Sequence, residues 1–218
     1  MSIGAHPSFH DIQGFGRRRV HMSAREIECM VAYQIGALAG IAAAAGAKVT
    51  HVKPHGALNN MAHEDPAYAT AIARAIRAVD RDLIFVANAC SEMVKAGHRE
   101  GVRVAEEAYA DRLYEDDGRL ASRALPDAMI TEPERAIRQV TTFIEERAIV
   151  SRNGVKLPAR SISRRTGFSS IRRLPKVMAS AGRHAEGRAV SLLEGGYALS
   201  ALGRSAVQHL KVLAGLNA

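Results

Sequence analysis

Residues 48–60 read Lys48-Val49-Thr50-His51-Val52-Lys53-Pro54-His55-Gly56-Ala57-Leu58-Asn59-Asn60, and the fold is most clearly indicated by this stretch. Its first residues predict a strand, which Pro54 and Gly56 end. His51, Lys53 and His55 alternate, so a strand that continues through them presents all three on one face. We therefore expect two imidazoles and an ammonium group at the carboxyl end of a strand, where parallel α/β proteins bind ligands. The alternative is a loop with solvated polar side chains.

Helical and strand patterns alternate on both sides of this stretch. Ser23-Ala24-Arg25-Glu26 is a capping box that opens a helix to about residue 45, and Asp65-Pro66 opens another to about residue 79. The remaining expected elements are strands at 83–87 and 102–106, a short helix at 91–97 and a helix at 132–147. This alternation predicts an α/β fold with a parallel sheet, either a barrel or a doubly wound sheet.

Polar residues recur where the predicted strands end. His6 follows a short apolar start, and Glu107, Asp111 and Arg112 follow strand 102–106. Because the carboxyl ends of parallel strands meet at one edge of a sheet, we expect these residues and the His51–His55 group to form a single site. The loop Gly14-Phe15-Gly16-Arg17 is glycine-rich and cationic, and such a loop can hold an anion through its backbone N–H groups.

The composition indicates a globular, cytoplasmic protein. The chain has 218 residues, of which 47% are hydrophobic and 24% charged, and it contains no Trp. Residues 2–10 are polar and lack a signal-peptide pattern, and the apolar run at 35–47 is too short for a membrane span. Cys29 and Cys90 lack CxxC spacing and are interpreted as reduced core thiols.

The net charge of +8 is unevenly distributed. Residues 1–150 hold 18 basic and 20 acidic residues, a net −2, whereas residues 151–218 hold 12 basic and 2 acidic residues, a net +10. A basic tail can bind an acidic partner or nucleic acid. Nucleic acid is not expected here, because no aromatic platform or known motif accompanies the charge, and a solvated Arg-rich surface is the simpler interpretation.

Five motifs, in this order along the chain, resemble the LamB/YcsF family, which is identified with the A subunit of 5-oxoprolinase. They are Gly4–Phe9, Gly14–Arg17, Tyr33–Leu38, His51–Asn60 and Glu106–Arg112. The resemblance covers residues 2 to 150. It implies a (β/α) barrel of the glycoside hydrolase/deacetylase type and a part in the ATP-dependent hydrolysis of 5-oxoproline, a lactam, to glutamate. It also implies ATP as a cofactor used by the complex, and the other 5-oxoprolinase subunits as partners.

The chain departs from the family pattern in three places. The family begins with an acidic strand of the Asp-Leu-Asn-Asp-Leu-Gly-Glu type, which is missing here, and Asn59 stands where the family usually has Tyr. The family's closing Val-His-Gly-Asp turn is also missing after about residue 161. We therefore expect an incomplete barrel over residues 1–150, a basic linker over 151–186 and a tail over 187–218, and we leave open whether such a truncated chain is active.

The tail resembles another group of enzymes. Residues 187–199, which contain Glu194-Gly195-Gly196-Tyr197, are similar to the C-terminal segment of histone-deacetylase-like amidohydrolases. There the Tyr after the Gly-Gly pair stabilises the developing oxyanion. Tyr197 matches that position, but the zinc ligands of that group are not recognisable, so we do not expect Tyr197 to be catalytic. The tail still predicts a rearranged strand-turn-helix unit.

Opening a lactam requires cations that bind anionic groups and a base that directs water. On the family's reaction, we assign His6, His55 and Asp111 to catalysis, and Lys53, Arg17, His51 and Asn60 to substrate or phosphate binding. A divalent metal held by the imidazoles is a further candidate cofactor. Each role has an alternative: Lys53 as a solvated cation, Arg17 as one of three exposed arginines, His6 as a turn cap, His51 as a core histidine, and Asp111 as the ion-pair partner of Arg112.

Two other functions remain open at this point. A metal-dependent amidohydrolase of the deacetylase type would draw on Tyr197 and need bound zinc. A non-catalytic chimeric fragment would use the basic tail to bind a partner. Measured metal content separates the first from the second, and turnover of 5-oxoproline separates both from a 5-oxoprolinase component.

Overall fold

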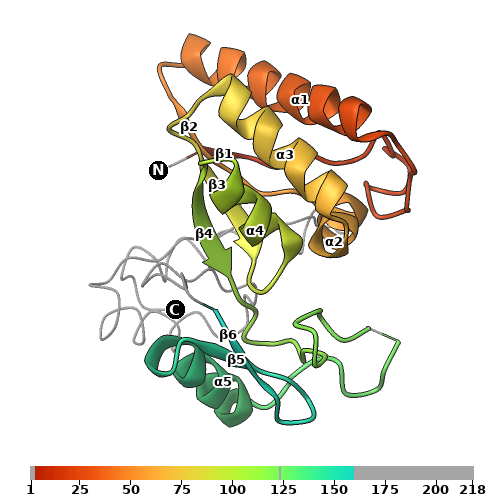
Figure 1. Ribbon diagram of the computed structural model, residues 1–218, viewed down its shortest axis with the longest axis vertical. Helices are drawn as coiled ribbons and strands as arrows, with labels where there is room; N and C mark the ends of the chain where they lie inside the picture. Colours follow the sequence, from red (N-terminus) through yellow and green to blue (C-terminus); the bar gives the residue numbers. More distant parts are fainter. Residues whose placement is uncertain (1–2, 123, 160–218) are drawn as a thin grey trace, which may run out of the picture. The chain divides into compact units, whose positions relative to one another are not determined.

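The structure, a computed structural model, describes residues 3–122 and 124–159 (Figure 1). The chain divides into two compact units, Met1–Glu106 and Glu107–Ala218. This division falls inside the predicted first domain, and the boundaries predicted at 150 and 186 stay predictions. Tyr197 and the predicted tail unit lie outside the described residues.

The first unit is built on a four-stranded sheet in the order β1-β2-β3-β4. Its strands are β1 (Ile3–Ala5), β2 (Val49–Val52), β3 (Ile84–Asn88) and β4 (Arg103–Glu107). β1 pairs in parallel with β2, with Ala5 opposite Val52, and β2 pairs in parallel with β3, with Val52 opposite Phe85. The predicted α/β fold with a parallel sheet is therefore confirmed, and its strands lie in chain order with no switch point.

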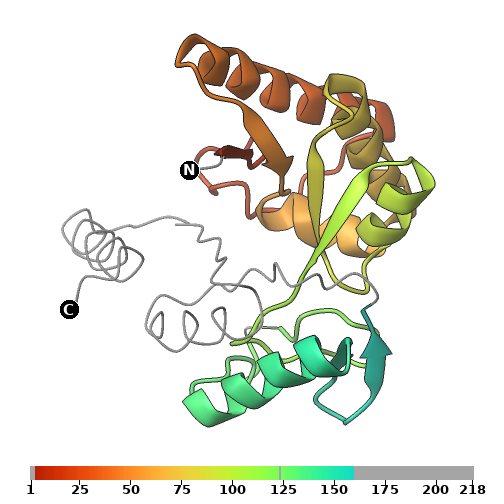
Figure 2. The ribbon, with the colours of Figure 1, turned by 90° about the vertical axis from the view of Figure 1, so that its left-hand side faces the viewer.

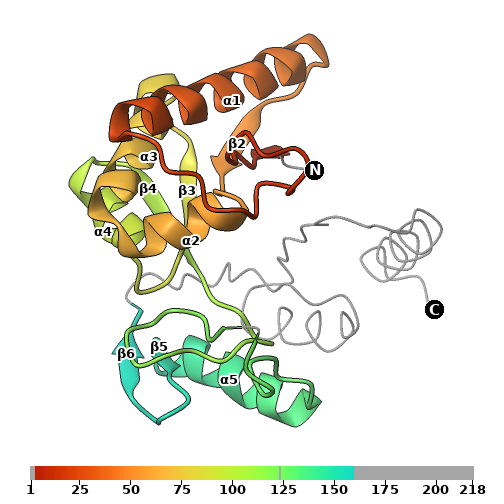
Figure 3. The same ribbon diagram turned by 90° about the vertical axis from the view of Figure 1, so that its right-hand side faces the viewer.

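Helices cover one face of this sheet (Figures 1 and 2). α1 (Ala24–Ala44) packs on β1 and β2, α4 (Glu92–Arg99) packs on β3, and α3 (Pro66–Val79) packs between the two helices. A short helix, α2 (Gly56–Glu64), follows β2 and contacts α3 and α4 (Figure 3). The core between helices and sheet contains fully buried apolar side chains: Ile27, Val31, Ile35, Val52, Ile72, Ile76 and Phe85.

The other face of the sheet is only half-buried. In β3, Phe85 and Ala87 are buried, whereas Ile84 and Val86 keep partial exposure. The prediction of a strand buried on both faces is therefore wrong for the described residues, in which helices cover only the face that carries Phe85. Such a half-covered parallel sheet is unusual, since parallel sheets normally have both faces packed.

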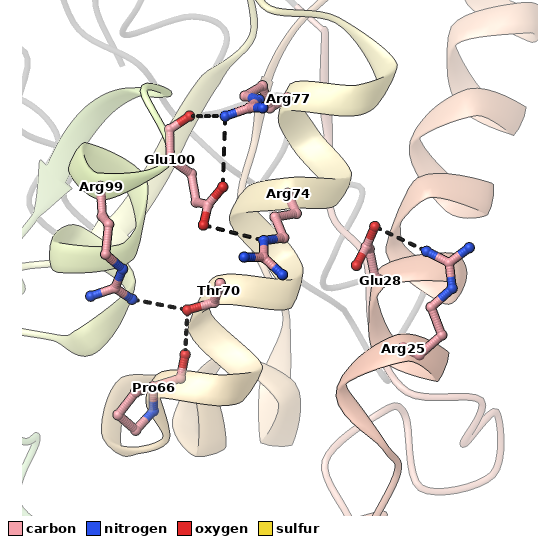
Figure 4. A network of polar contacts seen from close by, with 8 residues as sticks. All are labelled: Arg25, Glu28, Pro66, Thr70, Arg74, Arg77, Arg99 and Glu100. Atoms are coloured by element: carbon pink, nitrogen blue, oxygen red, sulfur yellow. Dashed lines mark hydrogen bonds and ion pairs between the residues drawn. The ribbon is translucent and has the colours of Figure 1, made fainter.

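Ion pairs tie the outer helices together (Figure 4). Glu100, just after α4, accepts hydrogen bonds from α3 through its side chain, from Arg74 Nε at 3.2 Å, and through its carbonyl oxygen, from Arg77 at 3.0 Å. Arg99 donates in the opposite direction, to Thr70 Oγ1 at 2.9 Å. These contacts are exposed to solvent, so they align the two helices while contributing little to the free energy of unfolding.

The second unit contains α5 (Pro133–Glu145) and an antiparallel hairpin of β5 (Ala148–Val150) and β6 (Lys156–Pro158). The segment before α5 is irregular but pinned. Gln139 on α5 donates to the carbonyl oxygens of Tyr109, at 2.6 Å, and Arg112, at 2.8 Å. The turn predicted around Asp117-Gly118 is present, with Glu115 N–H donating to Arg119 O at 2.7 Å.

α1 and the cysteines differ from two expectations. By length and composition alone, α1 is apolar enough to cross a membrane, a criterion that core helices of globular proteins also meet. Its buried residues Ile27, Val31 and Ile35 belong to the core of the first unit. The prediction of two core thiols is wrong for Cys29, which is exposed, whereas Cys90 is half-buried.

Candidate functional site

Polar side chains collect at the carboxyl edge of the first unit's sheet. His6 follows β1, and Lys53 and His55 follow β2. Lys53 and His55 are only 6% and 8% exposed, whereas the side chain of His6 is open to solvent. The chain crosses between these strands by hydrogen bonds from Lys53 N–H to Ala5 O and from His55 N–H to Pro7 O, both 2.9 Å long. The predicted convergence of His6 with Lys53 and His55 is therefore what the structure shows.

Hydrogen bonds join His6 and His55 into one chain of contacts. His6 Nδ1 contacts the carbonyl oxygen of Lys53. His6 Nε2 lies 3.1 Å from His55 Nδ1, and His55 Nε2 lies 2.9 Å from the carbonyl oxygen of Phe15. The two rings meet edge to face, with centroids 4.7 Å apart. Both imidazoles are thereby fixed in orientation by the backbone on either side.

These contacts fix the number of ring hydrogens on the pair. Carbonyl oxygens only accept hydrogen bonds, so His6 Nδ1 and His55 Nε2 each carry a hydrogen. The contact between the two rings needs one further hydrogen. Three ring hydrogens on two imidazoles correspond to one neutral imidazole and one imidazolium. The fully bonded pair therefore carries one positive charge and holds one proton that it can transfer.

The loop 11–18 brings the Phe15 carbonyl to His55. Asp11 is buried and accepts hydrogen bonds from Gly14 N–H at 3.0 Å and from Arg18 through its backbone and guanidinium. The hydrogen bonds from Arg18 are the main reason why the pKa of Asp11 falls from 3.8 to about 2. The carboxylate thus closes the loop on itself, and Phe15 adopts a left-handed backbone with φ 55° inside it.

The same loop docks on the first turn of α2. Gly16 O accepts a hydrogen bond from Ala57 N–H at 2.9 Å. Gly56 has φ 58°, and a Cβ there would lie 2.4 Å from Gly16 O. Only glycine permits this close approach in a left-handed conformation. The glycines at 16 and 56 are therefore needed to hold the loop against the helix that His55 begins.

The amino terminus of α2 is a cationic corner. His55 is its N-cap residue but makes no side-chain cap hydrogen bond, because its imidazole is engaged by His6 and Phe15. Buried Lys53 precedes it, and exposed Arg17 stacks over the Phe15 ring at 5.5 Å. A helix amino terminus and nearby cations together favour an anion. This corner can hold a carboxylate or phosphate next to the imidazole pair.

A side chain of α1 fixes the loop that follows His6. Gln34 accepts a hydrogen bond from Ser8 N–H at 3.0 Å and donates to Ser8 O at 2.8 Å. Sequence reasoning gave Gln34 no role, since nothing in its neighbourhood distinguishes it from a solvated helix residue. Its effect is to hold the chain just beyond His6 against the helix layer.

Further polar residues at this edge were also missed. Asn88, the last residue of β3, and Glu106, near the end of β4, are buried. Cys90 follows β3 with a left-handed φ of 63°. Burial, together with the nearby Glu106 charge, raises the pKa of the Cys90 thiol to about 11. Their position after predicted strands was the available signal, but a single buried Asn or Glu has no distinctive local pattern.

The remaining predicted site residues lie elsewhere. His51 packs over Gly4, hydrogen-bonds Thr50 Oγ1 at 3.0 Å, and has its pKa lowered by burial. Asn60 is exposed on α2. Asp111 belongs to the second unit, where its carbonyl oxygen accepts from Ile130 N–H at 2.8 Å. The structure thus joins His6, Lys53 and His55, with Arg17 at their rim.

Metal binding stays a prediction. Within residues 3–122 and 124–159, no group of three His, Cys, Asp or Glu side chains is arranged to hold a metal ion. Two imidazoles bonded to each other and to carbonyl oxygens have their ring nitrogens engaged, which suits proton transfer better than ligation.

Comparison with known proteins establishes the family. The sequence profile of the LamB/YcsF family matches residues 1–164. The chain belongs to the LamB/YcsF family. The resemblance predicted from the five motifs is thereby confirmed. The match ends before residue 187, so the likeness of the tail to histone-deacetylase-like enzymes receives no support from it.

Several LamB/YcsF relatives are named as the A subunit of 5-oxoprolinase. The one from Rhodopseudomonas palustris (strain BisB18) is 52% identical over 162 residues, which are 74% of this chain and 64% of the relative. The one from Tolumonas auensis is 49% identical over 154 residues, 71% of this chain and 61% of the relative. The chain thus spans about three fifths of the length of the curated relatives it matches.

A solved structure shares the fold. The crystal structure of the lactam utilization protein from Thermus thermophilus matches with a TM-score of 0.69 and 31% sequence identity, and the match covers 100% of this chain and 76% of that one. Both LamB/YcsF membership and this neighbour place the chain among proteins whose names refer to lactams.

Proposed function

We propose that this chain acts as the A subunit of a 5-oxoprolinase, a lactam hydrolase component that takes part in the ATP-dependent opening of 5-oxoproline to glutamate with other subunits. The observation that carries the proposal is the singly charged His6–His55 pair beside Lys53 at the carboxyl edge of a parallel sheet. The names of the relatives, one of them 52% identical, support the substrate class and the multi-subunit assembly.

The reaction requires what this corner offers. 5-Oxoproline is an anion, and Lys53, Arg17 and the amino terminus of α2 supply positive charge for its carboxylate. Water adds to the lactam carbon, and the C–N bond then breaks. The leaving nitrogen would depart as an unstable anion unless it receives a proton. The imidazolium of the pair donates that proton, and the neutral pair is recharged from solvent through exposed His6.

ATP has a defined chemical use in this proposal. Ring closure is favoured at equilibrium, so hydrolysis needs an activated amide, and ATP bound in the complex supplies a phosphoryl group to the amide oxygen. The cationic corner would accommodate the added phosphate charge. Whether this chain or another component of the complex binds ATP is left to experiment.

We also propose that the first unit is an arc of a (β/α) barrel. Its strands follow one another in chain order, and its helices lie on one face only. A doubly wound sheet would reverse strand order and place helices on both faces. In a barrel, the half-buried face carrying Ile84 and Val86 would point inward.

Turnover tests the proposed function. The full chain is assembled with the other 5-oxoprolinase subunits, and glutamate release from 5-oxoproline and ATP is measured. His55→Gln should lower the rate about 100-fold or more, the usual loss of a general acid. His98→Gln changes an exposed histidine on α4 and should leave the rate unchanged. No glutamate from the wild-type assembly, or full activity in H55Q, would contradict the proposal.

A further inference from the structure

Asn59 on α2 holds a buried hydrogen-bond acceptor that the fold does not use. The residue is only 7% exposed. Among the described residues, its side-chain oxygen Oδ1 is enclosed and has no hydrogen-bond partner. Buried polar atoms in folded proteins nearly always have a partner, so such an atom calls for an explanation.

Asn59 lies one helical turn beyond His55. Its N–H lies 3.4 Å from the carbonyl oxygen of His55, the contact that begins the turn. Residues four apart on a helix have Cβ atoms roughly 5–6 Å from each other on one side of the helix. That separation is about the width of a five-membered ring with its substituents, so a small cyclic molecule held at His55 can reach Asn59.

The amide of Asn59 is loosely held. Its Nδ2 donates to Asn60 Oδ1 over 3.4 Å, near the upper limit for a hydrogen bond. Turning the terminal amide breaks this long contact and exchanges the positions of Nδ2 and Oδ1, and such terminal torsions have broad minima. The enclosed oxygen can thus be presented to a ligand at little cost.

We propose that Asn59 is a substrate-positioning residue that accepts a hydrogen bond from the ring N–H of a lactam. This inference rests on the proposed function. A lactam carboxylate offers acceptors on its carboxylate and carbonyl groups, which Lys53, Arg17 and the charged imidazole pair satisfy. It offers one donor, the ring N–H, and none of those cationic groups can accept from it. Asn59 Oδ1 supplies the missing acceptor and selects lactams over lactones, which lack the donor.

The test compares two ligands that differ in this one group. Dissociation constants are measured for 5-oxoproline and for its γ-lactone analogue, in which oxygen replaces the ring N–H. The protein is the full chain assembled with the other subunits, as wild type, Asn59→Leu or Asn153→Leu. Leucine removes the acceptor at similar size, and Asn153 is an exposed residue of the second unit that makes the control substitution.

We expect the wild type and N153L to bind the lactam about tenfold more tightly than the lactone, and N59L to bind both alike through weakened lactam binding. An unchanged ratio in N59L would overturn the role of Asn59 while leaving the proposed function intact. A wild-type ratio near one would do the same without any variant, even if N59L failed to fold. A wild type that binds neither ligand would overturn the proposed function, and this inference with it.

Discussion

At the scale of single residues, backbone carbonyls decide what the site can do. The oxygens of Lys53 and Phe15 bind the outer nitrogens of the His6–His55 pair, and this arrangement leaves a transferable proton between the rings. The sequence could predict that His6, Lys53 and His55 meet, because each follows a strand. It could not predict the bonding between them, since carbonyl directions depend on how the 11–18 loop folds.

Replacing Lys53 by Met should separate binding from stability. Lys53 is 6% exposed, and methionine keeps the length of the side chain while removing its charge. The KM for 5-oxoproline should rise about tenfold or more through the loss of a charged contact with the carboxylate. The free energy of unfolding should stay constant or increase, because a buried charge is costly. Steady-state kinetics and urea unfolding measure the two effects, and an unchanged KM would exclude Lys53 from substrate binding.

Replacing Asp11 by Asn should change the response to acid. Because the folded state lowers the pKa of Asp11 from 3.8 to about 2, the carboxylate stabilises the fold fully above pH 3.8. This contribution is lost as the pH falls through that range toward about 2. The urea midpoint of D11N should therefore be lower than that of wild type near neutral pH, and the difference should shrink below pH 3.8. A difference that stays constant with pH would contradict the Asp11–Arg18 contact as its cause.

At the scale of elements, the contact between the 11–18 loop and α2 assembles the site. α2 was not predicted, because Pro54 and Gly56 are typical of a turn and the N-cap residue His55 is a poor cap. The long helices were predicted to within a few residues, since their capping residues and apolar stripes are local features. The hairpin of β5 and β6 was missed because its strands have only three residues each.

Two glycine substitutions test the loop contact. Gly56 and Gly46 both have left-handed φ angles, of 58° and 69°, but only at Gly56 would a Cβ meet a neighbouring atom, Gly16 O. Gly56→Ala should therefore cost about 1–3 kcal/mol of unfolding free energy and also lower turnover, because the loop is pushed off His55. Gly46→Ala should cost about 1–2 kcal/mol from backbone strain alone and leave turnover intact. Equal turnover in the two variants would show that the loop position does not matter for catalysis.

At the scale of the whole molecule, the first unit is a sheet covered on one face, with its polar residues gathered at one edge. The α/β class and the parallel sheet could be predicted from the alternation of elements. That alternation left open a barrel or a doubly wound sheet, because it does not reveal strand order. The observed order β1-β2-β3-β4 favours the barrel. Buried polar residues such as Asn88 and Glu106 became visible only when the strands were aligned.

The proposed chemistry depends on one extra proton that the imidazoles of His6 and His55 share in the folded chain. Nuclear magnetic resonance of the full chain with ¹⁵N-labelled histidine counts ring hydrogens directly, and His6→Gln and His55→Gln assign the signals. Near neutral pH we expect three ring N–H groups on the pair, with one hydrogen lying between the rings. Two ring hydrogens, with neither ring bonded to the other, would show that the pair holds no such proton.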